Sequence, residues 1–242
     1  MKGSCKTSDP TQVIVEELDT SDIIHRPKSL TFTAPFCSFA GIIYVARKHR
    51  GIIPGAYYHI CNRATEQRLL FKAKADYELW IRTLKEALEK YPLNIYAFCV
   101  MPNHWHILAS CSSRKLFMRA MQWLGATHAI RWRKRAESVG KGAVYQSRYR
   151  CHRVKPNQIF WVVARYIERN PVRASLTDSP FAWEWSSAGQ KKGGEIPMYE
   201  WPIPKPTNWE DFLKRGGDPV EESQIREALI RGQPFFEFKK RL

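Results

Sequence analysis

The sequence predicts an α+β fold in which helices pack on a mainly antiparallel sheet of four to five strands. Short runs of aromatic and β-branched residues alternate with longer runs whose apolar residues recur every three or four positions. The order of the runs is strand, helix, two strands joined by a turn, helix, strand and helix, which is typical of an α+β sandwich. Apolar residues make up 44% of the 242 residues, so the chain can bury a substantial core.

The first strand and the first helix are expected before residue 92. AYYHICNR at 56–63 has the aromatic and β-branched character of a strand. In the next run, Trp80, Leu84 and Leu88 recur at four-residue intervals, so they share one helical face. This spacing predicts a helix over 76–91, and a proline follows it.

Two strands and a long helix come next. NIYAFCVM at 94–101 and HWHILAS at 104–110 predict strands joined by a turn that contains proline and asparagine. Serines at the start of the following run can cap a helix expected over 113–137. The last turns of that helix are strongly basic.

A fourth strand and a third helix complete the pattern. AVYQSRYRCHRV predicts a strand over 143–154, and prolines bracket a helix expected from 156 to 170. The full order of elements matches a ferredoxin-like sandwich.

The chain divides into three parts by composition. Residues 1–45 lack clear periodicity and predict a poorly ordered extension, and the folded domain is expected over 46–190. Residues 191–242 begin with a segment rich in proline, glycine and tryptophan. They predict a tail with a linker and a short helix near 221–231.

The charge indicates a polyanionic partner. The formal net charge is +16, from 39 Lys and Arg against 23 Asp and Glu. An excess of this size most often marks a nucleic-acid-binding protein. No membrane partner is expected, because no run pairs an apolar face with a lysine-rich face and no apolar stretch is long enough to cross a bilayer.

The cysteines predict a reducing compartment. None forms a CxxC pair, and their spacing matches neither a zinc motif nor a disulfide framework. Reduced thiols and the absence of an apolar signal sequence at the N-terminus predict a cytoplasmic location. The cysteines are Cys5, Cys37, Cys61, Cys99, Cys111 and Cys151.

Two histidines with one residue between them form the most informative motif. Side chains two apart on a strand point to the same face, so His104 and His106 can project together and hold one divalent cation. Open coordination positions on such a cation can accept phosphate oxygens. Taken alone, the HxH spacing also fits coincidence. His59, His128 and His152 are weaker candidates, because no close partner is evident for the first two and the third lies among arginines.

A tyrosine on the third predicted helix is the candidate nucleophile. Tyr166 and Asn170 lie four residues apart and share a helical face, so the amide oxygen of Asn170 can complete the cation site while the phenol points at a bound phosphate. The alternative is a structural aromatic residue in the core. Tyr145 and Tyr149 are rivals on the strand that bears arginines.

Basic residues interleaved with an aromatic residue suit a single nucleic-acid strand, whose backbone and base faces are both accessible. For each residue alone, a solvated charged surface is the simpler explanation. The candidates for DNA contact are Arg63, Arg131, Arg133, Lys134, Arg135, Arg148, Tyr149, Arg150, Arg153 and Arg173.

Several motifs occur together in one order: MPNHWHIL, YQSRYR, YIERNPVRA and WEWSS. In this the chain resembles the REP-associated tyrosine transposases, which are relatives of the IS200/IS605 single-strand transposases in the HUH endonuclease superfamily. The resemblance covers about 46–190, with a weaker similarity in IREALIRGQPF. It implies that 46–190 is an IS200-like catalytic domain with the ferredoxin-like fold.

The resemblance also implies an activity. His104 and His106 match the family's paired metal ligands, Tyr166 matches its catalytic tyrosine, and Asn170 matches the position of its third metal ligand. The implied enzyme uses Mg²⁺ or Mn²⁺ to cut single-stranded or hairpin DNA and forms a 5′-phosphotyrosine. Relatives act as monomers or as homodimers, and the resemblance implies a bacterial, nucleoid-associated protein. Two other interpretations stay open, a catalytically silent hairpin-binding module of the same fold and an RNA-binding protein.

Overall fold

The computed structural model describes residues 51–140, 142–190 and 194–231, all within one compact unit. The expected extension at 1–45 lies outside the described residues. The elements in chain order are β1 (Tyr57–Arg63), α1 (Lys74–Lys90), β2 (Asn94–Met101), β3 (His104–Ser110), α2 (Arg114–Arg135), β4 (Arg150–Val154), α3 (Gln158–Glu168), α4 (Asn170–Arg173), α5 (Trp209–Lys214) and α6 (Pro219–Arg231). Short 3₁₀ turns occupy Thr65–Gln67 and Pro180–Ala182.

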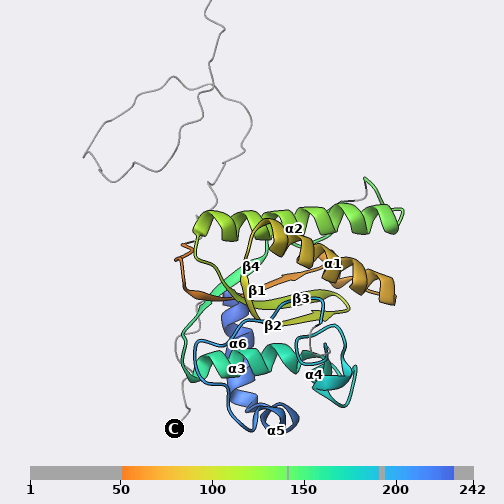
Figure 1. The fold of residues 1–242 in the computed structure, drawn as a ribbon. Coiled ribbons are helices and arrows are strands. Elements are labelled where there is room, and N and C mark those ends of the chain that lie inside the picture. The colour runs from red at the N-terminus through yellow and green to blue at the C-terminus, as the bar shows by residue number, and fades with distance from the viewer. Residues whose placement is uncertain (1–50, 141, 191–193, 232–242) are drawn as a thin grey trace, which may run out of the picture. The chain divides into compact units, whose positions relative to one another are not determined.

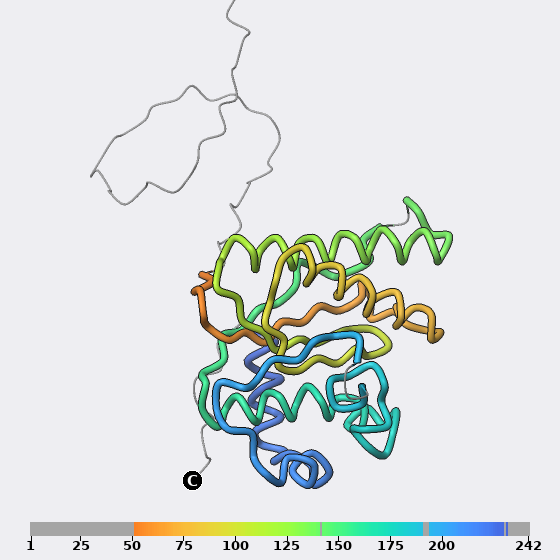
Figure 2. The backbone as a smooth tube through the Cα atoms, in the orientation of Figure 1, coloured from red at the N-terminus to blue at the C-terminus, as the bar shows by residue number. Residues whose placement is uncertain are grey.

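The four strands form one antiparallel sheet in the order β2-β3-β1-β4, which confirms the predicted fold class. Helices α1 and α2 cover one face of the sheet, and α3 to α6 lie on the other side (Figures 1 and 2). This unit therefore has three layers, with the sheet between two layers of helices. None of the described helices is long and apolar enough to cross a membrane.

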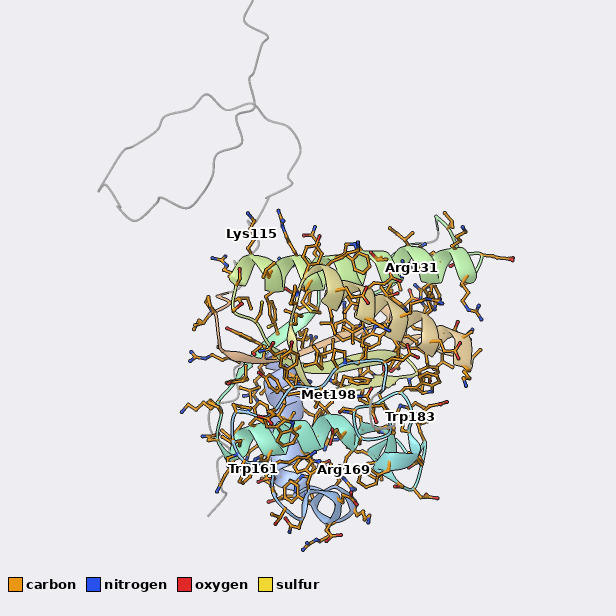
Figure 3. All side chains as sticks on the ribbon, viewed as in Figure 1. Lys115, Arg131, Trp161, Arg169, Trp183 and Met198 are labelled. Atoms are coloured by element: carbon orange, nitrogen blue, oxygen red, sulfur yellow. The ribbon has the colours of Figure 1, made fainter. Side chains whose placement is uncertain are left out.

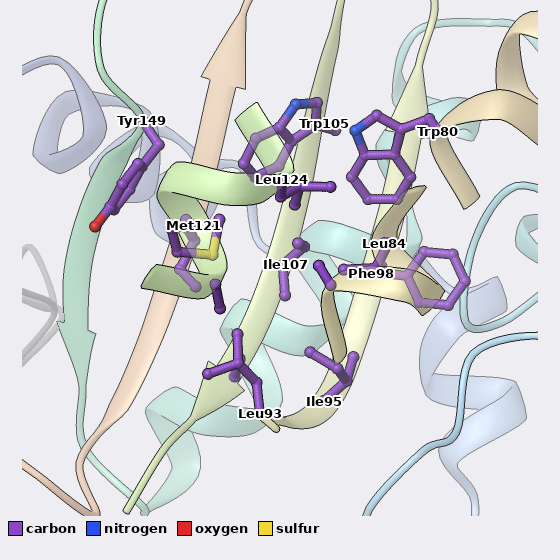
Figure 4. Close-up of a cluster of buried hydrophobic side chains, with 14 of the residues drawn as sticks. Trp80, Leu84, Leu93, Ile95, Phe98, Trp105, Ile107, Met121, Leu124 and Tyr149 are labelled. Atoms are coloured by element: carbon purple, nitrogen blue, oxygen red, sulfur yellow. The ribbon is translucent and has the colours of Figure 1, made fainter. Parts of the chain in front are cut away.

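Two hydrophobic cores lie on the two sides of the sheet. On β3, Trp105 and Ile107 face α1 and α2, where Trp80 and Leu84 pack against the sheet (Figure 4). The strand period then turns the intervening residues of β3 toward α3. The side of the sheet that carries the paired histidines is thus fixed by burial of the large apolar residues between and after them.

The fourth strand is shorter than the expected 143–154, because residues in its first half make other contacts than regular strand pairing. Tyr145 forms an isolated bridge with Ala64, and its hydroxyl binds the side chains of Trp105 and His128. These contacts place the tyrosine in the first core and delay regular pairing until Arg150.

The third helix also differs from the expected 156–170. The side chain of Asn157 caps its first turn by accepting from the amide of Ile159 at 3.0 Å. The helix ends at Glu168, and Pro171 occupies the first turn of α4, where proline is favoured. The expected short helix near the C-terminus corresponds to α6, whereas α5 was not predicted.

The segment after α4 protects the outer edge of the sheet. The backbone of Val100 on β2 accepts from the Trp183 indole at 2.9 Å and donates to the Trp185 carbonyl at 2.9 Å. Farther along the chain, the Tyr199 amide donates to the Ile95 carbonyl at 2.8 Å. The backbone groups of β2 that an edge strand leaves unpaired are therefore covered by the same chain.

Candidate active site

The paired histidines of β3 project toward α3, as the strand period predicts. The ring centroids of His104 and His106 are 4.9 Å apart, and the rings are nearly perpendicular. Between them, Trp105 points to the opposite face, where its indole donates to the Tyr145 hydroxyl at 3.1 Å. This buried contact holds the strand so that both imidazoles face the same side.

Helix α3 brings Tyr166 to these histidines. The centroid of its ring lies 5.9 Å from that of His106 and 6.2 Å from that of His59. Four residues later, Asn170 donates from Nδ2 to the Tyr166 carbonyl at 2.9 Å. Its amide nitrogen faces the end of α3, so its oxygen Oδ1 is turned toward Arg173, from which it accepts a hydrogen bond.

A cavity of about 350 Å³ connects these residues. Its walls come from all four strands of the sheet, from α3, α4 and α6, and from the loop before β4. Of the residues predicted from the sequence, those that line it are His104, His106, Tyr166, Asn170, Arg63, Arg150 and Arg173. The structure thus brings together all the proposed metal ligands, the proposed nucleophile and three of the proposed DNA contacts.

A second layer of hydrogen bonds orients both imidazoles. His104 Nδ1 lies 2.6 Å from Asn103 Oδ1, and His106 Nδ1 lies 2.8 Å from His59 Nε2. Since Asn103 offers an acceptor, His104 carries its proton on Nδ1 and keeps a lone pair on Nε2. His106 Nε2 is buried and has no hydrogen-bond partner among the described residues. These donor atoms, together with Asn170 Oδ1, fit a divalent cation with nitrogen and oxygen ligands.

Burial keeps the histidines neutral. It lowers the pKa of His104 to about 3, aided by the charges of Arg63 and Arg173, and it lowers the pKa of His106 well below its usual value. A neutral imidazole retains the lone pair that a metal requires. Burial raises the pKa of the Tyr166 phenol, and Arg173 opposes this shift by its charge and a hydrogen bond. The guanidinium carbon of Arg173 lies 4.1 Å from the centre of the tyrosine ring.

Acid should destabilise the fold through these histidines. The unfolded chain binds protons near pH 6.5, whereas burial lowers the folded pKa of His104 and of His128 to about 3 and also depresses those of His59 and His106. The contribution of these histidines to the free energy of unfolding is therefore fully present above pH 6.5. It is lost as the pH falls, by about 1.4 kcal/mol per pH unit for each neutral histidine. Urea unfolding with chelator at pH 7.5, 6.0 and 5.0 measures how steeply the free energy of unfolding falls with pH. His128→Gln should make this dependence shallower by the contribution of one histidine. A stability independent of pH over this range would contradict the assignment.

Three histidine expectations are corrected by the structure. His59 was expected to lack a close partner, yet it is buried and hydrogen-bonded to His106. His128 was expected to lack one as well, and it binds the Tyr145 hydroxyl at 2.7 Å. His152 was expected at the surface or facing nucleic acid because of its neighbouring arginines, yet it is 2% exposed and lies opposite His59 in the sheet.

Cys61 was not predicted to be a site residue from the sequence. With His59 and His106 it offers ligand atoms that all lie within 4.8 Å of one another. Burial raises the pKa of its thiol to about 12. The signal was present in the sequence, since His59 and Cys61 have the same two-residue spacing as the HxH pair and must share a strand face.

The basic end of α2 does not contribute to the cavity. Arg131 forms a two-pronged salt bridge with Glu86 on α1, with N–O distances of 2.8 and 2.7 Å. Figure 3 places it on the α2 side of the sheet, opposite α3. Arg135 pairs with Asp76 at 2.8 Å, so these residues join α1 to α2. Arg133 donates to the Ser138 carbonyl at 2.9 Å, and Lys134 is exposed.

The arginines around β4 divide between several environments. Arg150 lines the cavity, and Arg148 lines a neighbouring hollow of about 490 Å³. Arg153 is exposed on β4. Tyr149, expected to stack on bases, is 8% exposed and belongs to the first core, with its hydroxyl donating to Met118 Sδ at 3.5 Å. Its ring packs in this core, and its side chain also lines the neighbouring hollow.

Helix α6 adds a wall that the sequence did not indicate. Arg226 and Leu229 line the cavity, and the Leu229 carbonyl accepts from Arg150 at 2.7 Å. Arg165 of α3 pairs with Glu221 at 2.8 Å. The C-terminal helix is therefore fastened beside the candidate site from two directions, and it contributes another cationic side chain.

Similarity searches place the chain among known proteins. The family model described as "Transposase IS200 like" matches residues 53–170. A search of curated proteins found no match. Among solved structures, the chain is similar to a REP-associated tyrosine transposase bound to a REP hairpin, with 14% identity, coverage of 81% of this chain and 98% of that chain, and a TM-score of 0.49.

Two further solved structures were matched at lower TM-scores. A proposed transposase from Deinococcus radiodurans is 16% identical over 54% of this chain and 92% of its own, with a TM-score of 0.36. The tRNA(His) guanylyltransferase from Saccharomyces cerevisiae is 12% identical over 78% of this chain and 83% of its own, with a TM-score of 0.37. The sequence match over 53–170, which spans every strand and the residues around the cavity up to Asn170, is the informative one. The domain that these residues form belongs to the IS200-like transposase family.

Proposed function

We propose that the protein is a metal-dependent DNA strand transferase that cuts single-stranded, hairpin-bearing DNA and becomes covalently linked to it through Tyr166. One observation carries the proposal. The phenol of Tyr166, the paired imidazoles of β3 and the oxygen of Asn170 line one cavity, beside the guanidinium group of Arg173. The hairpin is inferred from the resemblance of the sequence motifs to those of REP-associated transposases.

Arginines make the cavity suitable for a phosphodiester. Arg63, Arg150, Arg173 and Arg226 line it, and no Asp or Glu is among the described residues that do. Arg173 is fixed by its contacts with Tyr166 and Asn170, while its Nη1 is buried without a hydrogen-bond partner among the described residues. A phosphate oxygen would satisfy that donor, because guanidinium groups bind phosphate through charge-assisted hydrogen bonds.

The reaction follows from the position of the phenol. The oxygen of Tyr166 attacks the phosphorus atom, the bond from phosphorus to the 3′-oxygen breaks, and a free 3′-hydroxyl leaves. The 5′-phosphate stays on the tyrosine, which preserves the energy of the phosphodiester for a later joining step. A 3′-hydroxyl then attacks the phosphotyrosine and releases the phenol. Arg173 supports the phenolate, because its positive charge lowers the cost of removing the phenol proton in a buried site.

The cation in this proposal is Mg²⁺ or Mn²⁺, held by His104 Nε2, His106 Nε2 and Asn170 Oδ1. When bound, such a cation polarises the scissile phosphate as a Lewis acid. The residues of the chain prepare the site, because Asn103 and His59 fix the orientation of the two imidazoles. All of these groups and Tyr166 come from one chain, so we propose that cleavage needs no second copy.

A route for the DNA continues beyond the cavity. Asn62 and Ser147 line both the cavity and the neighbouring hollow, which lies beside α2 and contains Arg148. Backbone phosphates on this route would meet Arg63, Arg150 and Arg148 in turn. Such contacts are sequence-independent and weaken as the salt concentration rises.

The proposal is tested by incubating the full-length protein with a hairpin oligonucleotide labelled at its 3′ end and Mn²⁺, followed by a denaturing gel. A labelled band that moves with the protein and disappears after protease treatment supports strand transfer. Tight binding of the hairpin without such a band would favour the catalytically silent binding module. Stronger competition by RNA than by DNA of the same sequence would favour an RNA ligand.

Replacing Arg173 should impair chemistry more than folding. Arg173→Gln removes the charge beside Tyr166 and one phosphate donor, so we expect cleavage to fall by about 10- to 100-fold at saturating DNA. Arg131→Gln is the matched control, because Arg131 binds Glu86 on the opposite side of the sheet. Single-turnover rates measure both variants. Equal loss in the two would show that the effect arises from reduced stability or overall charge.

A further inference from the structure

A second group of side chains that could hold a metal ion adjoins the candidate active site and shares His106 with it. On β1, the strand period turns His59 and Cys61 toward α3, and the sheet register pairs Cys61 with His106 on β3. The ligand atoms of these three residues all lie within 4.8 Å of one another. The group is fixed by two neighbouring strands, which position side chains more rigidly than loops do.

The donor atoms of this group differ from those of the proposed catalytic site. Two imidazoles and a thiol, with no carboxylate or amide oxygen, form a set that prefers Zn²⁺ and similar thiophilic cations over Mg²⁺. In a tetrahedral zinc site the nitrogen and sulfur ligands are roughly 3.3–3.6 Å apart, from the usual bond lengths. The observed spacing therefore requires only small side-chain movements. Cys61 and His106 both line the cavity, which provides a path for the ion and a position for a fourth ligand.

His106 belongs to both groups, and its two nitrogens face different ways. Its Nδ1 is hydrogen-bonded to His59 Nε2 at 2.8 Å, with one proton held between two nitrogens, and its Nε2 is buried without a hydrogen-bond partner among the described residues. A cation bound to Nδ1 takes the place of that proton. A neutral imidazole has only one lone pair, so metal on Nδ1 places the proton on Nε2. His106 can then no longer serve a cation shared with His104 and Asn170.

We propose that His59, Cys61 and His106 form an inhibitory site for Zn²⁺ or another thiophilic divalent cation, and that occupation of this site prevents occupation of the catalytic one. The inhibition rests on the function proposed above, whereas the binding site itself does not. The same His59–His106 contact would thus orient the catalytic ligand when protonated and disable it when metallated.

Cobalt binding tests the site without reference to activity. Co²⁺ is titrated into the reduced full-length protein in the absence of Mg²⁺ and DNA, and the near-ultraviolet charge-transfer absorption of a cobalt–thiolate bond is measured. The wild type should develop this band at one equivalent, and Cys61→Ser should lose it. Cys151→Ser is the matched control, because Cys151 lies on the neighbouring strand and packs against the opposite core. Absence of the band in the wild type, or its persistence in Cys61→Ser, overturns the proposal.

Inhibition is tested by adding Zn²⁺ to the cleavage reaction at a fixed Mn²⁺ concentration. Each variant is compared with its own rate without zinc. One equivalent of Zn²⁺ should slow the wild type and Cys151→Ser at least 10-fold, and Cys61→Ser less than 2-fold. Equal inhibition of all three would refute the inhibitory role. A cobalt band without any DNA cleavage would instead leave the site intact and refute the function proposed for the cavity.

Discussion

Tyr166→Phe should abolish the covalent protein–DNA adduct and reduce strand cleavage by at least about 10³-fold, because the variant lacks the attacking oxygen. The aromatic ring and its packing against Arg173 are retained, so binding of the hairpin should change by less than about threefold. The measurements are a denaturing gel for the adduct and a fluorescence-anisotropy titration for binding.

The control for this variant is another tyrosine near the DNA route. Tyr149→Phe removes the hydroxyl that donates to Met118 Sδ, and the ring stays in the core. It should form adduct at the wild-type rate. If Tyr166→Phe still forms the adduct, a different side chain is the nucleophile, and peptide mapping of the linked DNA would identify it.

His106→Gln should cause the second-largest loss. His106 supplies one of the proposed ligands and lies against Tyr166, so we expect cleavage to fall at least about 100-fold and the Mn²⁺ concentration for half-maximal activity to rise at least about 10-fold. Binding of the hairpin in chelator should be nearly unchanged, because this binding depends on the arginines. Metal titrations of cleavage and chelator-containing binding assays separate the two effects.

A second buried histidine provides the matched control. His128→Gln also replaces a neutral, buried imidazole, but on the α2 side, where it binds Tyr145. It should reduce stability without changing the Mn²⁺ requirement. An identical change in metal dependence for His128→Gln and His106→Gln would contradict the placement of the ion beside β3.

The sequence predicted the candidate site well where a strong local period controlled side-chain direction. The HxH pair faces one side because Trp105 and Ile107 are buried on the other. Tyr166 and Asn170 were expected to share a helical face. Both line the same cavity, although α3 ends at Glu168 and Asn170 begins α4. A helix end two residues earlier than predicted did not change this placement.

Other contacts depend on tertiary structure that no local pattern encodes. Arg226 reaches the cavity only because α6 returns to the sheet far along the chain, fastened by Arg150 and by an ion pair to Arg165. The basic end of α2 was predicted to contact DNA from its charge alone, and the sequence did not reveal the partners that Arg131 and Arg135 have on α1. These partners, such as Glu86 for Arg131, lie more than forty residues away.

Crystals soaked with Mn²⁺ and measured for anomalous scattering give the most direct test of the cavity as a catalytic centre. The proposed function predicts one strong peak bounded by His104 Nε2, His106 Nε2 and Asn170 Oδ1, with the Tyr166 hydroxyl facing the same space. A peak bound elsewhere, or no peak at a manganese concentration that supports cleavage, would contradict it.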